Sequence, residues 1–437
     1  MPRGPIKRRF LSMGLLGAIV EMMSDFFGMT GIPSAPGFRK SMPELEMGLV
    51  LGPKLKQENV RLNKMHKKSS ESNKVNPLKA LEAFGQSPWL DSLSRKLIDS
   101  GELAKLVKED GLKGITSNPA IFDKAVTQGS DYDAAILKRC DQKINDTEVL
   151  FESIAIEDIK DAAEVLYPVY KNSGGKDGFV SLEVSPRLAR DSKKTIEAAQ
   201  RLFKELARPN VMIKIPGTYE GLSAIEKSLA EGININITLL FSVTRYKEVS
   251  EAYINALEYR KKKGLSISDI SSVASFFVSR IDTAVDSILK DGALKGKTAI
   301  ANAKMAYKYF QELSQSSKFQ ELRKAGAKPQ RLLWASTSTK NPAYRDVLYI
   351  EELIGEETVN TIPLETWNAF KDHGKLRAAL KENVSEAQGV INQLPKAGVD
   401  LDKVCKDLEE AGIKAFADSY AHLLKNLEDK MKALDFK

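Results

Sequence analysis

Short apolar runs rich in β-branched residues recur along the chain from residue 76 onward, and amphipathic stretches separate them. Runs of this length are typical of buried strands, and the intervening stretches are long enough for helices. We therefore predict eight strands, at residues 89–91, 114–116, 179–184, 211–215, 233–239, 273–278, 332–336 and 359–362.

The stretches between the predicted strands follow a helical period, with apolar residues at three- and four-residue spacing from Ile159 to Tyr170 and from Tyr246 to Leu257. Alternating strands and helices form a parallel sheet, either open and doubly wound or closed into a barrel. No G-x-G-x-x-G motif follows a strand and opens a helix, which weakens the open dinucleotide-binding alternative. Eight repeats favour an α/β fold of the (β/α)8 TIM-barrel type over residues 76–437.

The last predicted helix, within residues 401–437, is an addition to the eight repeats. Its apolar residues form one stripe, made of Ile413, Phe416, Tyr420, Leu423, Leu427, Met431 and Leu434. Such a stripe is more typical of packing, across the barrel or against a second subunit, than of a cofactor site.

Residues 1–75 differ from the rest of the chain in their pattern of charged and apolar residues. Cations among the first nine residues precede an apolar run at 10–20, which superficially resembles a signal or transit segment. Glu21 and Asp25 interrupt this run, and it is too short to span a bilayer. We predict a poorly ordered basic extension, and whether it is a targeting segment, a functional tail or a start-site artefact stays open.

The net charge of +8 is concentrated in that extension. Residues 1–74 hold 13 Lys and Arg against 6 Asp and Glu, whereas residues 75–437 hold 53 against 52. The body is therefore nearly neutral, and it has no basic motif studded with aromatic residues. We expect no nucleic-acid partner and no membrane partner.

Cysteines and histidines are few and scattered. Cys140 and Cys405 lie far apart, and His66, His373 and His422 show no metal-ligand spacing. A zinc site has no support in the sequence, and a disulfide framework is not expected.

Lys214 lies within an apolar predicted strand, which makes it the most informative residue of the chain. Burial of an ammonium favours loss of its proton, and a neutral amine can attack a carbonyl to form a Schiff base. Lysines near strand ends also extend to solvent without any chemical role, so this residue alone does not decide.

Polar residues gather where the predicted strands end, which is where a barrel places its active site. Each of them has an ordinary structural explanation, such as helix capping, but capping does not require a lysine or a glutamate. The strand-end candidates are Asp91, Thr116, Ser117, Asn118, Glu183, Lys214, Asn236, Thr238, Ser275, Phe277, Arg280, Ser336 and Lys340.

Two long segments resemble the signatures of the transaldolase family. Residues 114–122, GITSNPAIF, are similar to the first signature. Residues 211–241, which include KIPGTYEGLSAIEKSLAEGININITLLF, are similar to the second, centred on the Schiff-base lysine. The resemblance extends through VSLEVSPRLARD, SSVASFFVSRID, LLWASTSTKNP and TVNTIP, and it covers residues 76–437.

The resemblance implies a transaldolase of the non-oxidative pentose phosphate pathway. Such enzymes transfer a dihydroxyacetone unit from sedoheptulose 7-phosphate or fructose 6-phosphate to glyceraldehyde 3-phosphate or erythrose 4-phosphate. It implies that Lys214 is the nucleophile and Asp91 the acid/base, and that Glu183 and Thr238 position a water. The reaction implied by this resemblance requires no cofactor and no metal.

The resemblance also implies binding residues. Asn118, Asn236 and Ser275 would bind substrate hydroxyls, Phe277 would form a wall, and Arg280 would hold the phosphate. The family commonly has a second arginine where this chain has Ser338, close to the serine matched by Ser336. We expect Lys340 to supply that charge.

Two other functions stay open. A Schiff-base fructose-6-phosphate aldolase would use the same residues, and a barrel that only binds a partner would not need the whole set. We expect a cytoplasmic monomer or homodimer, with organelle targeting through residues 1–75 as the alternative.

Overall fold

The computed structural model of the protein describes residues 75–127, 129–290 and 292–435. The predicted extension at residues 1–75 therefore lies outside the described residues, apart from Val75. In the described part of the chain, no helix combines the length and the apolar character needed to cross a membrane.

Eight parallel strands pair in sequence order, and β8 pairs with β1 to close a barrel. The predicted α/β barrel is confirmed. The strands are β1 Gln86–Asp91, β2 Gly114–Thr116, β3 Phe179–Glu183, β4 Val211–Pro216, β5 Ile235–Leu240, β6 Ser272–Phe277, β7 Arg331–Ala335 and β8 Thr358–Ile362.

The strand bounds differ from the predicted ones mainly at β1. The strand begins three residues earlier than predicted and includes Pro88, a residue that usually argues against a central strand because it lacks an N–H group. Its carbonyl still accepts a hydrogen bond from the Lys113 N–H at 2.8 Å. One missing donor is thus tolerated where the ladder to β2 is just beginning.

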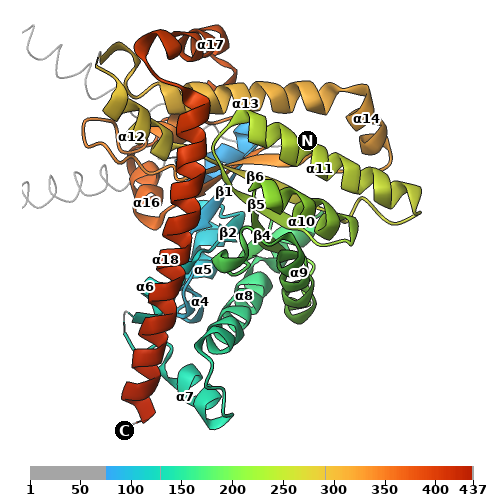
Figure 1. Cartoon of the computed structure of the whole chain (residues 1–437), viewed down its shortest axis with the longest axis vertical. Helices are drawn as coiled ribbons and strands as arrows, with labels where there is room; N and C mark the ends of the chain where they lie inside the picture. Colours follow the sequence, from blue (N-terminus) through green and yellow to red (C-terminus); the bar gives the residue numbers. More distant parts are fainter. Residues whose placement is uncertain (1–74, 128, 291, 436–437) are drawn as a thin grey trace, which may run out of the picture. The chain divides into compact units, whose positions relative to one another are not determined.

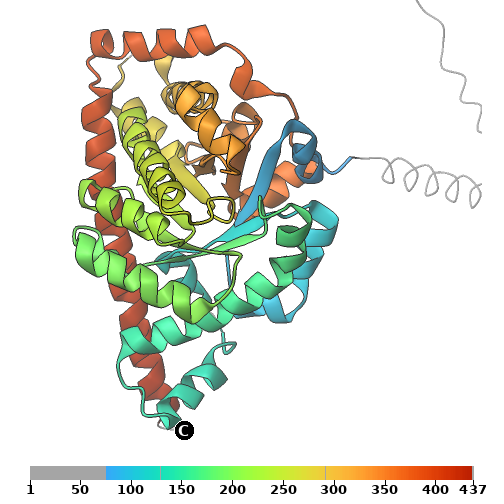
Figure 2. The same ribbon diagram turned by 90° about the vertical axis from the view of Figure 1, so that its right-hand side faces the viewer.

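Helices surround the strands (Figures 1 and 2). The predicted apolar stripes are confirmed, since Ile159 and Leu166 on one helix and Tyr246 and Leu257 on another are buried. The helices are α3 Pro77–Ala80, α4 Arg95–Asp99, α5 Glu102–Lys105, α6 Pro119–Thr127, α7 Asp133–Asp141, α8 Thr147–Asn172, α9 Ser192–Leu206, α10 Tyr219–Ala230, α11 Val243–Lys262, α12 Ser279–Ile288, α13 Thr298–Gln315, α14 Ser317–Lys324, α15 Leu348–Glu352, α16 Leu364–His373, α17 Val384–Gln393 and α18 Leu401–Asp435.

The long C-terminal helix α18 runs along one side of the barrel, as Figures 1 and 2 show in red. It packs against α6, α7, α8 and α12. Tyr420, Leu423 and Leu427 of the predicted stripe are buried in these contacts. The stripe therefore packs on the barrel of its own chain.

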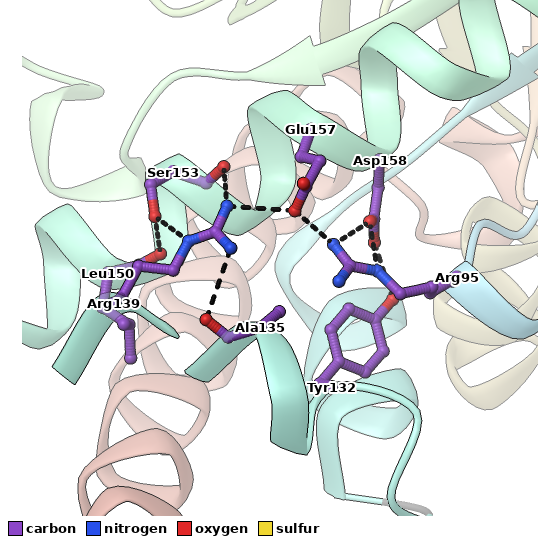
Figure 3. A network of polar contacts seen from close by, with 8 residues as sticks. All are labelled: Arg95, Tyr132, Ala135, Arg139, Leu150, Ser153, Glu157 and Asp158. Carbon is purple, nitrogen blue, oxygen red and sulfur yellow. Dashed lines mark hydrogen bonds and ion pairs between the residues drawn. The ribbon is translucent and has the colours of Figure 1, made fainter. Parts of the chain in front are cut away.

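A network of charged side chains joins α4 and α7 to α8 (Figure 3). Arg95 donates to Asp158 Oδ1 at 2.7 and 3.0 Å and to Glu157 at 2.8 Å, while Tyr132 donates to Asp158 Oδ2 at 2.8 Å. Arg139 reaches the same Glu157 at 3.0 Å. Each carboxylate oxygen of Asp158 thus has a donor, as buried charges require for stability.

Candidate active site

The strand register brings the predicted residues together. Glu183 of β3 pairs with Lys214 of β4, and Lys214 pairs with Asn236 of β5. In the two strands that precede β3 in the barrel, Asp91 of β1 pairs with Thr116 of β2. Since all strands are parallel, these side chains lie at the same end of the barrel.

Lys214 is buried, with 5% of its surface exposed. Its Nζ donates to Glu183 Oε2 and to the Ser117 carbonyl oxygen, both at 3.1 Å. The Ser117 hydroxyl in turn donates to the Ser181 carbonyl at 2.8 Å, which fixes the loop after β2. The Lys214 nitrogen is therefore held by one carboxylate and one carbonyl oxygen.

Asp91 is held by a threonine. Thr116 Oγ1 lies 2.8 Å from Asp91 Oδ1, to which it donates, and 2.6 Å from Thr361 Oγ1. Burial raises the pKa of the Asp91 carboxyl, and the nearby Lys214 ammonium opposes that rise. Burial also raises the pKa of Glu183, again opposed by Lys214. A carboxyl with a raised pKa can hold or release a proton closer to neutral pH.

One polar cavity of about 190 Å³ opens at this end of the barrel. It brings together the predicted Asp91, Asn118, Lys214, Thr238, Ser275, Phe277, Arg280, Ser336 and Lys340. Its remaining lining residues are Thr116, Ala335, Ser338, Thr361, Pro363 and Phe416.

Two buried oxygens beside Lys214 have no hydrogen-bond partner among the described residues. They are Glu183 Oε1 and Thr238 Oγ1. Thr238 lies in a register irregularity of β5, between Ile237 and Leu240, where Leu239 adopts a positive φ of 60°. Such bulges redirect a side chain next to an active site. These two oxygens are thus free to accept from a small polar molecule.

Asn236 and Ser275 are already bonded to each other. Ser275 Oγ donates to Asn236 Oδ1 at 2.7 Å, and Asn236 Nδ2 donates to Ser181 Oγ at 3.0 Å. Ser275 lines the cavity, and Asn236 is fully buried beside it. Asn118 lines the cavity and its Oδ1 also accepts from the Ile121 N–H, which starts α6.

Arg280 and Lys340 bring positive charge to the cavity. Arg280 lies in the first turn of α12, and no described carboxylate forms an ion pair with it. Ser336, in the loop after β7, has a positive φ of 55°, and its hydroxyl lies 3.0 Å from that of Ser279, next to Arg280. Lys340 Nζ donates to Ser338 Oγ at 2.7 Å. Two cations without carboxylate partners form a site suited to an anion.

The described residues contain no group of three His, Cys, Asp or Glu side chains that could hold a metal ion.

Residues 88–427 match the model of a family described as transaldolase/fructose-6-phosphate aldolase. The chain belongs to this family. The family predicted from the sequence is thereby confirmed.

Relatives of the chain carry the transaldolase name. A transaldolase of Trichodesmium erythraeum is 44% identical over 376 residues, which cover 82% of this chain and 99% of the relative. Transaldolase 2 of Nostoc punctiforme is 46% identical over 379 residues, with the same coverage. A transaldolase of Thiobacillus denitrificans is 45% identical over 356 residues, covering 80% of this chain and 99% of the relative.

In this member of the transaldolase family, several cavity residues lay outside the predicted set. Thr361 lies in β8 and Pro363 comes directly after it, and no residue at the end of this strand was predicted to be functional. Thr116 was among the strand-end candidates but was given no role in the reaction, although it contacts Asp91 directly. Phe416 was assigned to a packing stripe, because an apolar residue at helical spacing carries no signal of a cavity.

Proposed function

We propose that this chain is a transaldolase that transfers a dihydroxyacetone unit between sugar phosphates through a Schiff base on Lys214. The observation that carries the proposal is the buried Lys214 amine, held by Glu183 and Ser117 at the wall of a polar cavity. The same cavity contains Asp91 and Arg280, with which no described carboxylate forms an ion pair. Family membership and the names of the relatives support the same activity.

In the proposed first step, the Lys214 amine attacks the C2 carbonyl of the donor ketose. The resulting carbinolamine must lose its hydroxyl as water, which requires a proton donor. Glu183 supplies that proton through a water bound to Thr238. What supports this role is the pair of buried oxygens on Glu183 and Thr238 that have no protein partner in the described structure.

In the second step, Asp91 takes the proton from the C4 hydroxyl and the C3–C4 bond breaks. The electron pair of that bond moves into the iminium, which becomes an enamine on Lys214, and an aldose phosphate leaves. Thr116 supports this role because its hydroxyl holds Asp91 in place from the next strand. Addition of the acceptor aldehyde reverses the step, and Asp91 returns the proton.

The remaining predicted residues bind the substrate. We propose that Asn118, Asn236 and Ser275 bind hydroxyls of the three-carbon unit, with Asn236 acting after its bond to Ser275 rearranges. Phe277 forms a wall of the cavity, and its ring lies 5.2 Å from that of Phe241, tilted by 45°.

The phosphate is bound where the cavity carries its positive charge. We assign it to Arg280, Ser336 and Lys340, with Ser338 in the place of a second arginine. The short bond between Lys340 and Ser338 supports this substitution of charge, because it directs the ammonium along the cavity wall.

Borohydride reduction with fructose 6-phosphate tests the central step. We expect a substrate-derived mass on Lys214, detected by peptide mass spectrometry. Lys304 is the matched control, because it is also a buried lysine, burial lowers its pKa, and its Nζ donates to the Glu382 carbonyl at 2.7 Å. Label on Lys304, or an unlabelled wild type, would contradict the proposal.

Dependence on an acceptor tests transfer against simple cleavage. We expect product formation from fructose 6-phosphate to depend on added erythrose 4-phosphate. Equal turnover without an acceptor would assign the chain to the aldolase activity of the family. We also propose that the enzyme acts in the cytoplasm, in the non-oxidative pentose phosphate pathway, as a monomer or homodimer.

A further inference from the structure

The C-terminal helix α18 delivers one aromatic side chain into the cavity. Phe416 is half-buried and lines the same cavity as Lys214, Asp91 and Arg280. Its ring centroid lies 5.4 Å from Lys214 Nζ, within the range of a cation–π contact. By their colours, Figures 1 and 2 show that α18 is distant in sequence from the strands β1 and β4 and the helix α12 that supply those three residues.

The helical turns on either side of Phe416 fix its position. One turn earlier, Gly412 packs so closely on the end of β5 that an added Cβ would lie 2.9 Å from Leu239 Cδ2. One turn later, Tyr420 packs edge-on against Phe151 at 5.7 Å, and its hydroxyl donates to Glu148 at 3.0 Å. The ring at Phe416 is therefore held between two anchors on one face of the helix.

The charge on the Lys214 nitrogen, which lies beneath this ring, changes during the proposed reaction. Formation of the iminium places a positive charge at the Lys214 nitrogen, which the face of an aromatic ring attracts. After cleavage, the neutral enamine must wait for an aldehyde. During that time an apolar cover keeps water from delivering a proton to its nucleophilic carbon.

We propose that Phe416 is an active-site lid residue that selects transfer over hydrolysis. The inference rests on the Schiff-base transaldolase function proposed above. In transfer, the enamine carbon forms a bond to the aldehyde carbon, Asp91 protonates the new alkoxide, and water then releases the ketose. In hydrolysis, the enamine carbon takes a proton from water, and the hydroxide left behind takes the proton that Asp91 holds. The iminium thus reforms, and a second water adds to it and releases dihydroxyacetone and the free amine.

The test measures the ratio of free dihydroxyacetone to transferred three-carbon unit, with fructose 6-phosphate as donor and erythrose 4-phosphate as acceptor. In Phe416→Ala, we expect this ratio to rise by about tenfold or more, because both the ring face and the cover are lost. In Phe416→Leu, which keeps an apolar cover of similar reach, the rise is smaller. Borohydride labelling of Lys214 persists in both variants.

Met431→Ala is the matched control, since Met431 is a partly buried apolar residue of the same helix that packs on the core away from the cavity. Its ratio should stay within about twofold of wild type. An unchanged ratio in Phe416→Ala, or an equal rise in Met431→Ala, would overturn the proposal. Failure of the underlying function shows differently, as a wild type that borohydride does not label.

Discussion

Two groups of buried charges in this molecule differ in how completely their atoms are bonded. The network around Arg95 and Asp158 gives both oxygens of Asp158 a donor and joins three helices (Figure 3). The group around Lys214 leaves Glu183 Oε1 without a protein partner in the described structure, and Lys214 itself lines a cavity.

The difference indicates which buried charges stabilise the fold and which are available for a reaction. Burial of an ion costs free energy that only well-placed partners recover, so a complete set of partners stabilises the fold. When the set of partners is incomplete, part of the free energy of burial is not recovered. In the group around Lys214, the unbonded atoms are available to a substrate or a water. We therefore expect substitutions in the first group to change stability and those in the second to change turnover.

Glu183→Gln makes the largest predicted change. The amide oxygen can still accept from Lys214 Nζ, but the side chain no longer transfers a proton. We expect kcat for the transfer reaction to fall by about 10²–10⁴-fold. The midpoint of urea unfolding should move little.

Glu351→Gln is its matched control. Glu351 is also a buried glutamate, but it is bonded by Arg345 at 2.9 and 3.0 Å and lies outside the cavity. Its kcat should stay within about twofold of wild type. Similar losses of kcat in the two variants would remove the distinction between the groups.

Arg95→Met tests the structural group. It leaves the Asp158 carboxylate buried without its cation, so we expect the free energy of unfolding to fall by about 3–5 kcal/mol. The kcat of the folded fraction should be unchanged. Chemical denaturation gives the first quantity, and initial rates at low temperature give the second.

Two further variants sharpen this test. Adding Asp158→Asn to Arg95→Met should recover part of the lost stability, because the amide needs no counter-ion. Lys105→Met removes a cation from an exposed pair with Glu102 and should cost about 1 kcal/mol or less. A loss equal to that of Arg95→Met would show that burial does not set the cost.

Asp282 is an intermediate case, since its oxygens are bonded by the Ala299 N–H and the Tyr349 hydroxyl but no described cation pairs with it. Burial raises its pKa well above the ordinary value of an aspartate, to about 6. The folded state therefore binds the proton more tightly than the unfolded state, and stability falls as the pH rises through this range. The loss reaches about 3 kcal/mol at most.

Asp282→Asn should remove that dependence. We expect the wild type to lose stability relative to the variant between about pH 4 and pH 6, measured by urea unfolding at each pH. Asp418→Asn, on the exposed face of α18, serves as the control and should track the wild type. A constant difference between wild type and Asp282→Asn across this range would contradict the raised pKa.

The sequence predicts one of these groups far better than the other. Lys214, Asp91 and Glu183 could be predicted because barrel geometry places every strand end at one rim, so position along the strand indicates position in space. Arg95 and Asp158 lie on different helices and have ordinary surface identities. Their meeting depends on how α4 packs against α8, which no local pattern encodes.

Phe416 shows a different limit of sequence reasoning. Its place in an apolar stripe was predicted correctly, and the neighbouring stripe residues do pack on the barrel. A helical pattern gives the face of a residue but not what lies opposite each turn. Positive φ at Leu239 and Ser336 is equally invisible, because neither residue type favours it.

Lys340→Met makes the smallest predicted change. It tests whether the group around Lys214, in which some polar atoms stay available to a substrate, extends to the residues proposed to bind the phosphate. Lys340 Nζ is bonded only to Ser338 Oγ among the described residues, so its removal leaves no buried carboxylate unpaired. We expect stability to be unchanged and KM for fructose 6-phosphate to rise about tenfold, with a smaller change in kcat. Adding Ser338→Arg to Lys340→Met should lower KM again, because the guanidinium restores the charge from a neighbouring position. A KM that stays at the wild-type value in Lys340→Met would leave Arg280 as the phosphate ligand and exclude Lys340 from that role.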